Sequence, residues 1–306
     1  MPINTLAVAT LMQTTLDTVA TQVALTGWME ANAGQIRYSG GNEIKIPKMS
    51  LQGLANYDRD TGYTQGSVTL SYETRSMTQD RGRKFVLDAM DVDETNFVAT
   101  ASTVMGEFQN QYVIPEIDAY RLSKLATTAI TKGTHVAYGY VPAEGTILRA
   151  IKTGIKQIRE QGYTGDLVVH ISTDAMLELE LAMSGKITTT TFSAGGIDTT
   201  VPAVDGVPLI ETPENRMYTA ITINDGKTAG QTDGGYSKGT TAKTINFIIV
   251  PRIAPIAVSK QDKMRIFDPE TYQDGNAWSM DYRRYHDLWV ADNKEDSIYL
   301  SVKEAA

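Results

Sequence analysis

The feature that most constrains the fold is a helical repeat of apolar residues between residues 91 and 129. Apolar side chains recur there every three or four positions, a period that predicts a helix and excludes a strand. The first members of this stripe are Phe97, Ala101, Val104, Met105, Phe108 and Tyr112. Pro115 has no amide donor and predicts a kink, after which Ile117, Tyr120 and Leu125 continue the stripe. We call this predicted helix the spine, with Phe97, Val104, Phe108 and Pro115 as its core positions.

Residues 36–90 have a different pattern, in which apolar and polar residues alternate. Glu43 to Ile46 and Val68 to Glu73 have the period of strands, and glycine-containing turns at 39–42 and 60–62 predict a long hairpin. A two-stranded ribbon is marginal in water and this one has too few large apolar residues for its own core. We therefore expect it to pack on another copy of the chain. The candidate contact residues at its tip are Tyr57, Arg59 and Asp60.

A basic group follows the hairpin at Arg81, Arg83 and Lys84, close to several acidic residues. Two interpretations stay open. The first is a solvated charged turn that leads into the spine, since exposed ion pairs contribute little. The second is an electrostatic contact with another subunit. A phosphate site is disfavoured because no glycine-rich phosphate-binding loop is present.

The remaining segments form an arm and a second structural unit. Residues 1–35 predict a weak helix, which packs either on its own domain or on a neighbouring subunit. Residues 133–244 predict an α/β unit, with a helix from Ile147, a strand at 167–171, a helix through Leu177 and Leu181, a short strand at 203–211 and a glycine-rich loop at 224–241. Strands at 245–250, 256–259, 264–267 and 298–302 are expected to return to the unit that holds the spine.

Composition excludes several functional classes. The chain has no cysteine, which excludes disulfides, thiolate metal sites and a cysteine nucleophile. A net charge of −8 disfavours a protein that grips the nucleic-acid backbone. No apolar run is long enough to span a membrane, and the first residues lack the basic start of a secretory signal, so we expect cytoplasmic synthesis and no membrane contact. His135, His170 and His286 lack metal-binding spacing, and we expect neither an enzyme nor a cofactor.

Several motifs together resemble one family. Residues 97–126, above all the run Val-Ile-Pro-Glu-Ile-Asp-Ala-Tyr-Arg-Leu-Ser at 113–123, are similar to the spine helix of the major capsid proteins of tailed bacteriophages, which have the Hong Kong 97-type fold. Asp-Gly-Val-Pro-Leu-Ile at 205–210 resembles a strand of that family's axial domain. Met-Arg-Ile-Phe-Asp at 264–268 and the run at 282–290 resemble its peripheral strands.

The resemblance implies an α+β fold with four parts. These are an N-terminal arm (1–35), an extended β-hairpin or E-loop (36–90), a peripheral domain with the spine helix (91–132 and 245–306) and an inserted axial α/β domain (133–244). It also implies a structural protein without a catalytic site, which assembles as hexamers and pentamers in the bacterial host cytoplasm and becomes part of the virion.

The partners implied by the resemblance are other copies of the chain, a portal, and double-stranded DNA that is enclosed without sequence-specific binding. Only about 35 residues precede the hairpin, whereas some members begin with a scaffolding segment of about a hundred, so a separate scaffolding protein is expected. Two alternatives remain: a bacterial nanocompartment (encapsulin-like) shell protein, and a surface or adhesion module.

Overall fold

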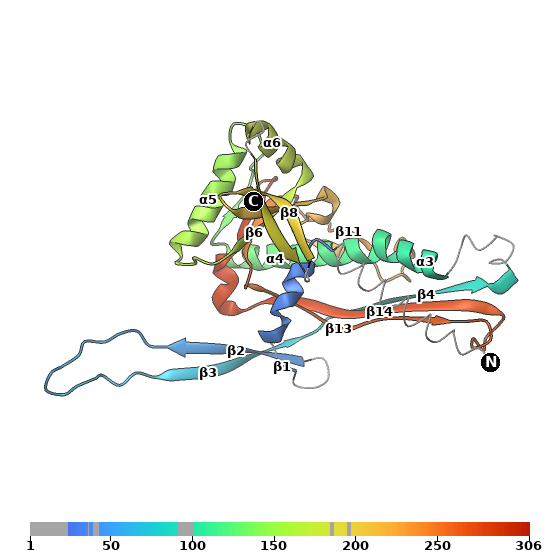
Figure 1. Cartoon of the computed structure of the whole chain (residues 1–306), viewed down its shortest axis with the longest axis horizontal. Helices are drawn as coiled ribbons and strands as arrows, with labels where there is room; N and C mark the ends of the chain where they lie inside the picture. The colour runs from blue at the N-terminus through green and yellow to red at the C-terminus, as the bar shows by residue number, and fades with distance from the viewer. Residues whose placement is uncertain (1–23, 36, 39–42, 91–100, 184–186, 195–196) are drawn as a thin grey trace.

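A computed structural model describes residues 24–35, 37–38, 43–90, 101–183, 187–194 and 197–306. One long helical segment crosses two β-sheets, and a narrow hairpin projects from the body at the opposite end from α3 (Figure 1). Most of the arm at 1–35, the predicted start of the spine and Phe97 lie outside the described residues.

The spine consists of three consecutive helical segments. These are α3 (Ala101–Phe108), a π-helical turn η2 (Gln109–Val113) and α4 (Ile114–Lys132), which ends at Gly133 with a left-handed φ of 68°. Pro115 lies in the first turn of α4, directly after the π-helical turn. Because proline cannot donate a backbone hydrogen bond, an irregularity is expected just before it. The predicted interruption therefore lies at this proline, but it takes the form of a wide turn between segments that continue in one direction (Figure 1).

The π-helical turn changes which side chains face the core. Met105 and Val113 are buried beside Ile117, and they pack on a three-stranded sheet together with Val104 and Phe108, which are partly buried. Tyr112 was predicted to continue the stripe but is 51% exposed. The extra residue in a π-helical turn shifts the register by one position, so that Val113 takes the place expected for Tyr112.

The three-stranded sheet under the first half of the spine has the order β13 (Pro255–Phe267), β14 (Ala277–Val290) and β4 (Gln79–Asp88), with both pairings antiparallel. β13 is one strand with an irregularity between Ser259 and Gln261, not the two strands predicted. β4 belongs to this sheet because its residues pair with β14 from Asp88 to Gln79. The hairpin therefore ends at Ser76, at the end of strand β3 (Val68–Ser76), and not at residue 90 as predicted.

A seven-stranded sheet lies against the second half of the spine. Its order is β5 (Val136–Ala137), β15 (Tyr299–Val302), β12 (Ile245–Pro251), β6 (Leu167–Ser172), β9 (Val207–Thr212), β8 (Ile197–Val204) and β7 (Thr188–Ala194). Only the β6–β9 and β15–β5 pairs are parallel among the described strands. β12 and β15 were expected in the peripheral domain (245–306). They instead pair inside this sheet, because their apolar side chains cover both of its faces.

Helices cover one face of the seven-stranded sheet and the spine covers the other. α5 (Ile147–Glu160) and α6 (Thr173–Met183) share a core with β6, β12 and β9. The predicted apolar stripe of α5 is confirmed at Ile147, Ile151 and Ile158, which are buried. The helix predicted through Leu177 and Leu181 is confirmed as α6, although these two side chains are 54% and 51% exposed. The buried face of α6 is formed by Ala175, Met176 and Leu179.

Short elements complete the body. β8 and β9 form a hairpin through Asp205 and Gly206, whose φ values of 52° and 78° identify a tight turn where a single strand at 203–211 was predicted. β10 (Ile221–Ile223) and β11 (Tyr236–Lys238) flank the glycine-rich loop. The 3-10 segments are η1 (Gly27–Gln35), η3 (Glu214–Arg216) and η4 (Asp292–Ser297).

The segment η1 is fixed to the seven-stranded sheet by a buried polar contact. Trp28 Nε1 donates a hydrogen bond to His170 Nε2 over 3.2 Å, and the two rings stack with centroids 6.1 Å apart. His170 Nδ1 therefore carries the proton and donates to Thr212 Oγ1 over 3.3 Å. Complete burial lowers the pKa of His170 to about 3.

The first prediction concerns the core under the spine. Met105→Ala should lower the free energy of unfolding by about 2–5 kcal/mol, because it leaves a cavity at a fully buried site. Phe108→Ala should cost less, because Phe108 is only partly buried although its ring centroid lies 5.0 Å from that of Phe85. Urea unfolding of both variants measures the difference. A larger loss for Phe108→Ala than for Met105→Ala would contradict this assignment of the core.

The second prediction concerns pH. In the unfolded chain His170 titrates near its usual pKa of 6.5, whereas the folded chain resists protonation down to a pKa of about 3. The stability that neutral His170 contributes is therefore fully present above pH 6.5 and is lost as the pH falls. The loss of unfolding free energy reaches about 2 kcal/mol at pH 5. His170→Gln should reduce the loss of unfolding free energy between pH 7 and pH 5. His135→Gln, at a half-buried surface site, is the control, and an unchanged pH dependence in His170→Gln would refute the assignment.

Candidate functional site

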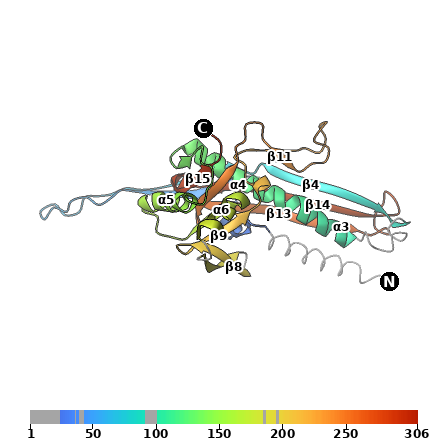
Figure 2. The ribbon, with the colours of Figure 1, turned by 90° about the horizontal axis from the view of Figure 1, so that it is seen from above.

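The most unusual surface of the molecule is the projecting hairpin. It consists of β2 (Glu43–Leu51) and β3 (Val68–Ser76), which pair in register from Glu43↔Ser76 to Leu51↔Val68, with β1 (Arg37–Tyr38) beside β2. Both views show β2 and β3 extending beyond the body (Figures 1 and 2). The sequence-based prediction of a long hairpin is thus confirmed for residues 43–76.

One face of the distal hairpin is an exposed apolar ladder. Residues at alternate positions share a face, and the register places Leu51 opposite Val68 and Met49 opposite Leu70 on one of them. The apolar ladder comprises Met49, Leu51, Val68, Leu70 and Tyr72, which are between 44% and 68% exposed. The loop beyond the strands adds Leu54 and Tyr63, which are 108% and 90% exposed. Contiguous exposed apolar surface of this kind is typical of an interaction site.

The other face of the hairpin is fixed to the body, but only near its base. Ile44 and Ile46 are buried in a small core with Ile256, Val258 and Trp289. Beyond Lys48 the side chains on this face are exposed as well. The hairpin is therefore anchored to the body at one end, and its other end does not pack against the described part of the body.

The tip holds the three candidate residues Tyr57, Arg59 and Asp60. A tight turn closes it through mutual backbone hydrogen bonds between Asp58 and Gly62, whose φ is 85°. The Tyr57 ring packs edge to face on Tyr63, with centroids 4.9 Å apart. All three candidates are exposed, so they are accessible to a partner, and their role in an interface stays a prediction.

The basic residues Arg81, Arg83 and Lys84 lie within strand β4 and not in a turn. Arg81 forms a two-bond ion pair with Glu116 of the spine, with Nε–Oε1 and Nη2–Oε2 distances of 2.7 and 3.1 Å. Lys84 Nζ donates to Tyr272 Oη over 3.3 Å and lies over its ring. The predicted turn is therefore wrong, and both solvent exposure and a subunit contact stay open for Arg83 and Lys84. The Arg81 side chain pairs with Glu116 of the same chain, whereas the Arg83 and Lys84 side chains are more exposed.

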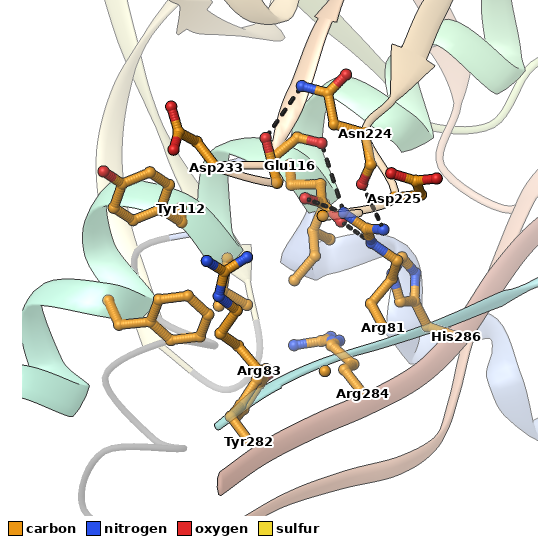
Figure 3. Close-up of a pocket in the computed structure, with 17 residues that line it drawn as sticks. Arg81, Arg83, Tyr112, Glu116, Asn224, Asp225, Asp233, Tyr282, Arg284 and His286 are labelled. Carbon is orange, nitrogen blue, oxygen red and sulfur yellow. Dashed lines mark hydrogen bonds and ion pairs between the residues drawn. The ribbon is translucent and has the colours of Figure 1, made fainter. Parts of the chain in front are cut away.

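Arg81 and Arg83 also donate hydrogen bonds to the glycine-rich loop, and Figure 3 shows the contacts of Arg81. Arg81 Nη1 donates to the carbonyl of Asn224 over 2.8 Å, and Arg83 Nη1 donates to the carbonyl of Thr232 over 3.4 Å. A cleft between this loop, β4 and the spine is lined at its base by Tyr282, Arg284 and His286. Arg81 thus joins the loop, the three-stranded sheet and the spine, a connection that the sequence pattern did not indicate.

The three histidines do not come together as a catalytic group. His170 and His286 are buried, and burial with nearby arginines keeps the pKa of His286 well below its usual value. His135 lies elsewhere, with Nδ1 3.2 Å from Gln157 Oε1. Among the described residues, no group of three or more histidine, aspartate or glutamate side chains is arranged to hold a metal ion. In the same part of the chain, no helix combines the length and apolarity needed to cross a membrane.

Comparisons with known proteins identify the fold. No family model matches the sequence, and no curated protein matches it. The structure is similar to the capsid structure of cyanophage P-SCSP1u, with a TM-score of 0.60 and 12% identity over 88% of this chain and 85% of that chain. It is also similar to a structure from Mycobacterium phage Che8 (TM-score 0.56, 12% identity, 88% and 87% covered). A third match is the mature capsid of bacteriophage PhiM1 (TM-score 0.56, 12% identity, 86% and 82% covered).

At this level of identity the similarity concerns the fold. The order of its parts agrees with the resemblance noted in the sequence, from the projecting hairpin through the spine to the sheet inserted after it. The chain therefore has the α+β fold of phage capsid proteins, the Hong Kong 97-type fold.

Proposed function

We propose that this chain is a structural shell protein, the major capsid protein of a tailed double-stranded DNA phage or prophage. The single observation that carries the proposal is the exposed apolar ladder on a hairpin that is anchored only at its base. When a neighbouring copy covers a surface of this kind, the burial of apolar area lowers the free energy of the assembly. In the proposed shell, hexamers and pentamers of the chain supply that cover.

Charge supports the proposed cargo. With a net charge of −8, the chain has little capacity to neutralise DNA phosphates, which suits a container that does not grip the DNA it encloses. The proposal includes assembly in the bacterial host cytoplasm with a separate scaffolding protein and a portal, and residence in the virion. It includes no enzymatic activity and no cofactor.

The test compares charged substitutions on two apolar surfaces of matched exposure. Met49→Asp with Leu70→Asp should abolish assembly, because carboxylates would be buried without partners in the subunit contact. Leu177→Asp with Leu181→Asp, on the exposed face of α6, is the control and should leave shells intact. Electron microscopy and analytical ultracentrifugation, with and without the candidate scaffolding protein, measure shells and capsomers, and circular dichroism confirms that each variant is folded.

Three outcomes would argue against the proposal. Normal shells from the hairpin variant would show that the apolar ladder is not a subunit contact. A wild-type chain that stays monomeric, or that forms fibres, would favour a surface or adhesion module. Closed shells whose purified contents are a protein cargo and not DNA would identify a nanocompartment.

A further inference from the structure

The base of the hairpin combines an apolar anchor with a charged one. Ile44 and Ile46 bury their side chains against the body, and the next residue on the same face is Lys48. Glu73 and Arg75 lie on this face of β3, since Glu73 pairs with Ile46 and Arg75 pairs with Ile44. Past this level, contact with the body ends and the hairpin side chains become exposed. The charged group is therefore located where the hairpin leaves the body.

The body contributes one side chain to this group, Asp292, at the start of η4 and two residues after β14 ends. Arg75 Nη2 lies 2.8 Å from Asp292 Oδ1, and Lys48 Nζ lies 3.4 Å from Asp292 Oδ2. Both cations belong to the hairpin and the carboxylate belongs to the body. These contacts therefore restrain the direction in which the hairpin leaves the sheet.

Glu73 is a second carboxyl group in the same place, and it lies farther from the two cations than Asp292 does. Its side chain is 13% exposed, and its carboxylate oxygens lie 3.9 Å from Lys48 Nζ and 3.6 Å from Arg75 Nη2. These separations are longer than hydrogen bonds. Neither carboxylate oxygen of Glu73 has a hydrogen-bond partner in the structure. Burial and the neighbouring carboxyl group of Asp292 raise the pKa of Glu73, against the opposing effects of Arg75 and of the Asp292 backbone.

Asp292 behaves in the opposite way. Burial acts to raise its pKa, but the neighbouring carboxyl group of Glu73 and a hydrogen bond from Lys48, with the charges of Lys48 and Arg75, lower the pKa on balance. The two carboxyl groups thus differ in acidity, so the first proton that the pair takes up resides on Glu73. The other acidic residues of η4, Glu295 and Asp296, pair instead with Lys132 of the spine, 3.6 and 3.8 Å away.

We propose that Glu73 and Asp292, flanked by Lys48 and Arg75, form a proton-dependent latch that sets the angle of the hairpin relative to the body. With the proton in place, Glu73 donates a hydrogen bond across the junction to Asp292, and the hairpin is held. Without it, two carboxylates face each other across the same junction and compete for the same two cations. The hairpin then moves about its apolar anchor.

The direction of the pH dependence follows from the raised pKa of Glu73, because Asp292 is the stronger acid and Glu73 is the group that takes up the proton. The closed latch is fully present below the usual glutamate pKa of 4.5 and is lost as the pH rises through the raised pKa of Glu73. Mild acid should therefore narrow the range of hairpin angles, and mild alkali should widen it. This behaviour belongs to the isolated chain and does not depend on the proposed shell function.

The absence of cysteine makes the angle directly measurable. Spin labels at Ser50→Cys on the hairpin and Thr131→Cys at the end of the spine attach only to these two thiols. Pulsed electron paramagnetic resonance then gives the distance distribution between them. We expect a narrow distribution at about pH 4, below the usual glutamate pKa, and a broader, shifted one at about pH 8, with circular dichroism confirming the fold at both values.

Three variants of the labelled chain separate the latch from general effects of pH. Glu73→Gln keeps a donor for Asp292 at every pH and should give the narrow distribution at both. Asp292→Asn removes the anchor for both cations and should give the broad one at both. Glu43→Gln, an exposed carboxyl group on the opposite face of β2, should respond to pH like the wild type. A wild-type distribution that is the same at both pH values, or a pH response that survives in Glu73→Gln, would overturn the proposal.

Discussion

The rest of the structure depends on the burial of α4, which is covered on nearly every side and carries two charged residues into the interior. Asp118 is completely buried and accepts hydrogen bonds from the backbone amides of Leu25 and Thr26, from Thr26 Oγ1 and from Arg216. Arg121, equally buried, donates to Thr26 and pairs with Glu30. Buried charges persist only when they are paired in this way. The buried charges of the spine are therefore paired only when η1 and η3 pack against it. Through Trp28 and Glu30, η1 in turn contacts both sheets.

The interior and the hairpin differ in how completely their side chains are packed and hydrogen-bonded. Along α4, polar groups find partners from distant parts of the chain, and Leu122 and Leu125 pack against the seven-stranded sheet. On the distal hairpin, the apolar side chains of the ladder are 44% to 68% exposed and pack on nothing in the described part of the body. A chain that is well packed in its body and unpacked in one extension is suited to a structure completed by neighbours. This division is the physical basis of the proposed shell, in which a neighbouring copy covers the hairpin on assembly.

The same strand links the two regions. β14 carries Tyr282, Arg284 and His286 beneath the spine, and Asp292 follows shortly after its end. Arg284 pairs with Glu30 of η1 and with Asp262 of β13, at 2.9 and 2.7 Å. Asp292, which contacts the hairpin, thus follows shortly after the strand that carries the buried Arg284 network. In the proposed latch, the direction of the hairpin is therefore set relative to the sheet that contains β14.

The sequence by itself determined the elements whose signals are local. The apolar period of the spine, the alternation in residues 43–76 and the helix from Ile147 all follow from side-chain spacing, and the order of motifs was enough to indicate the fold. Spacing does not reveal pairing partners, however. Only the tertiary structure decided that β4 pairs with β14, that β12 and β15 join the inserted sheet, and that Leu177 and Leu181 face outward, because each depends on contacts between residues far apart in sequence. For the same reason the sequence placed Arg81 on a free turn, whereas a carboxylate 35 positions away in the spine holds it in the body.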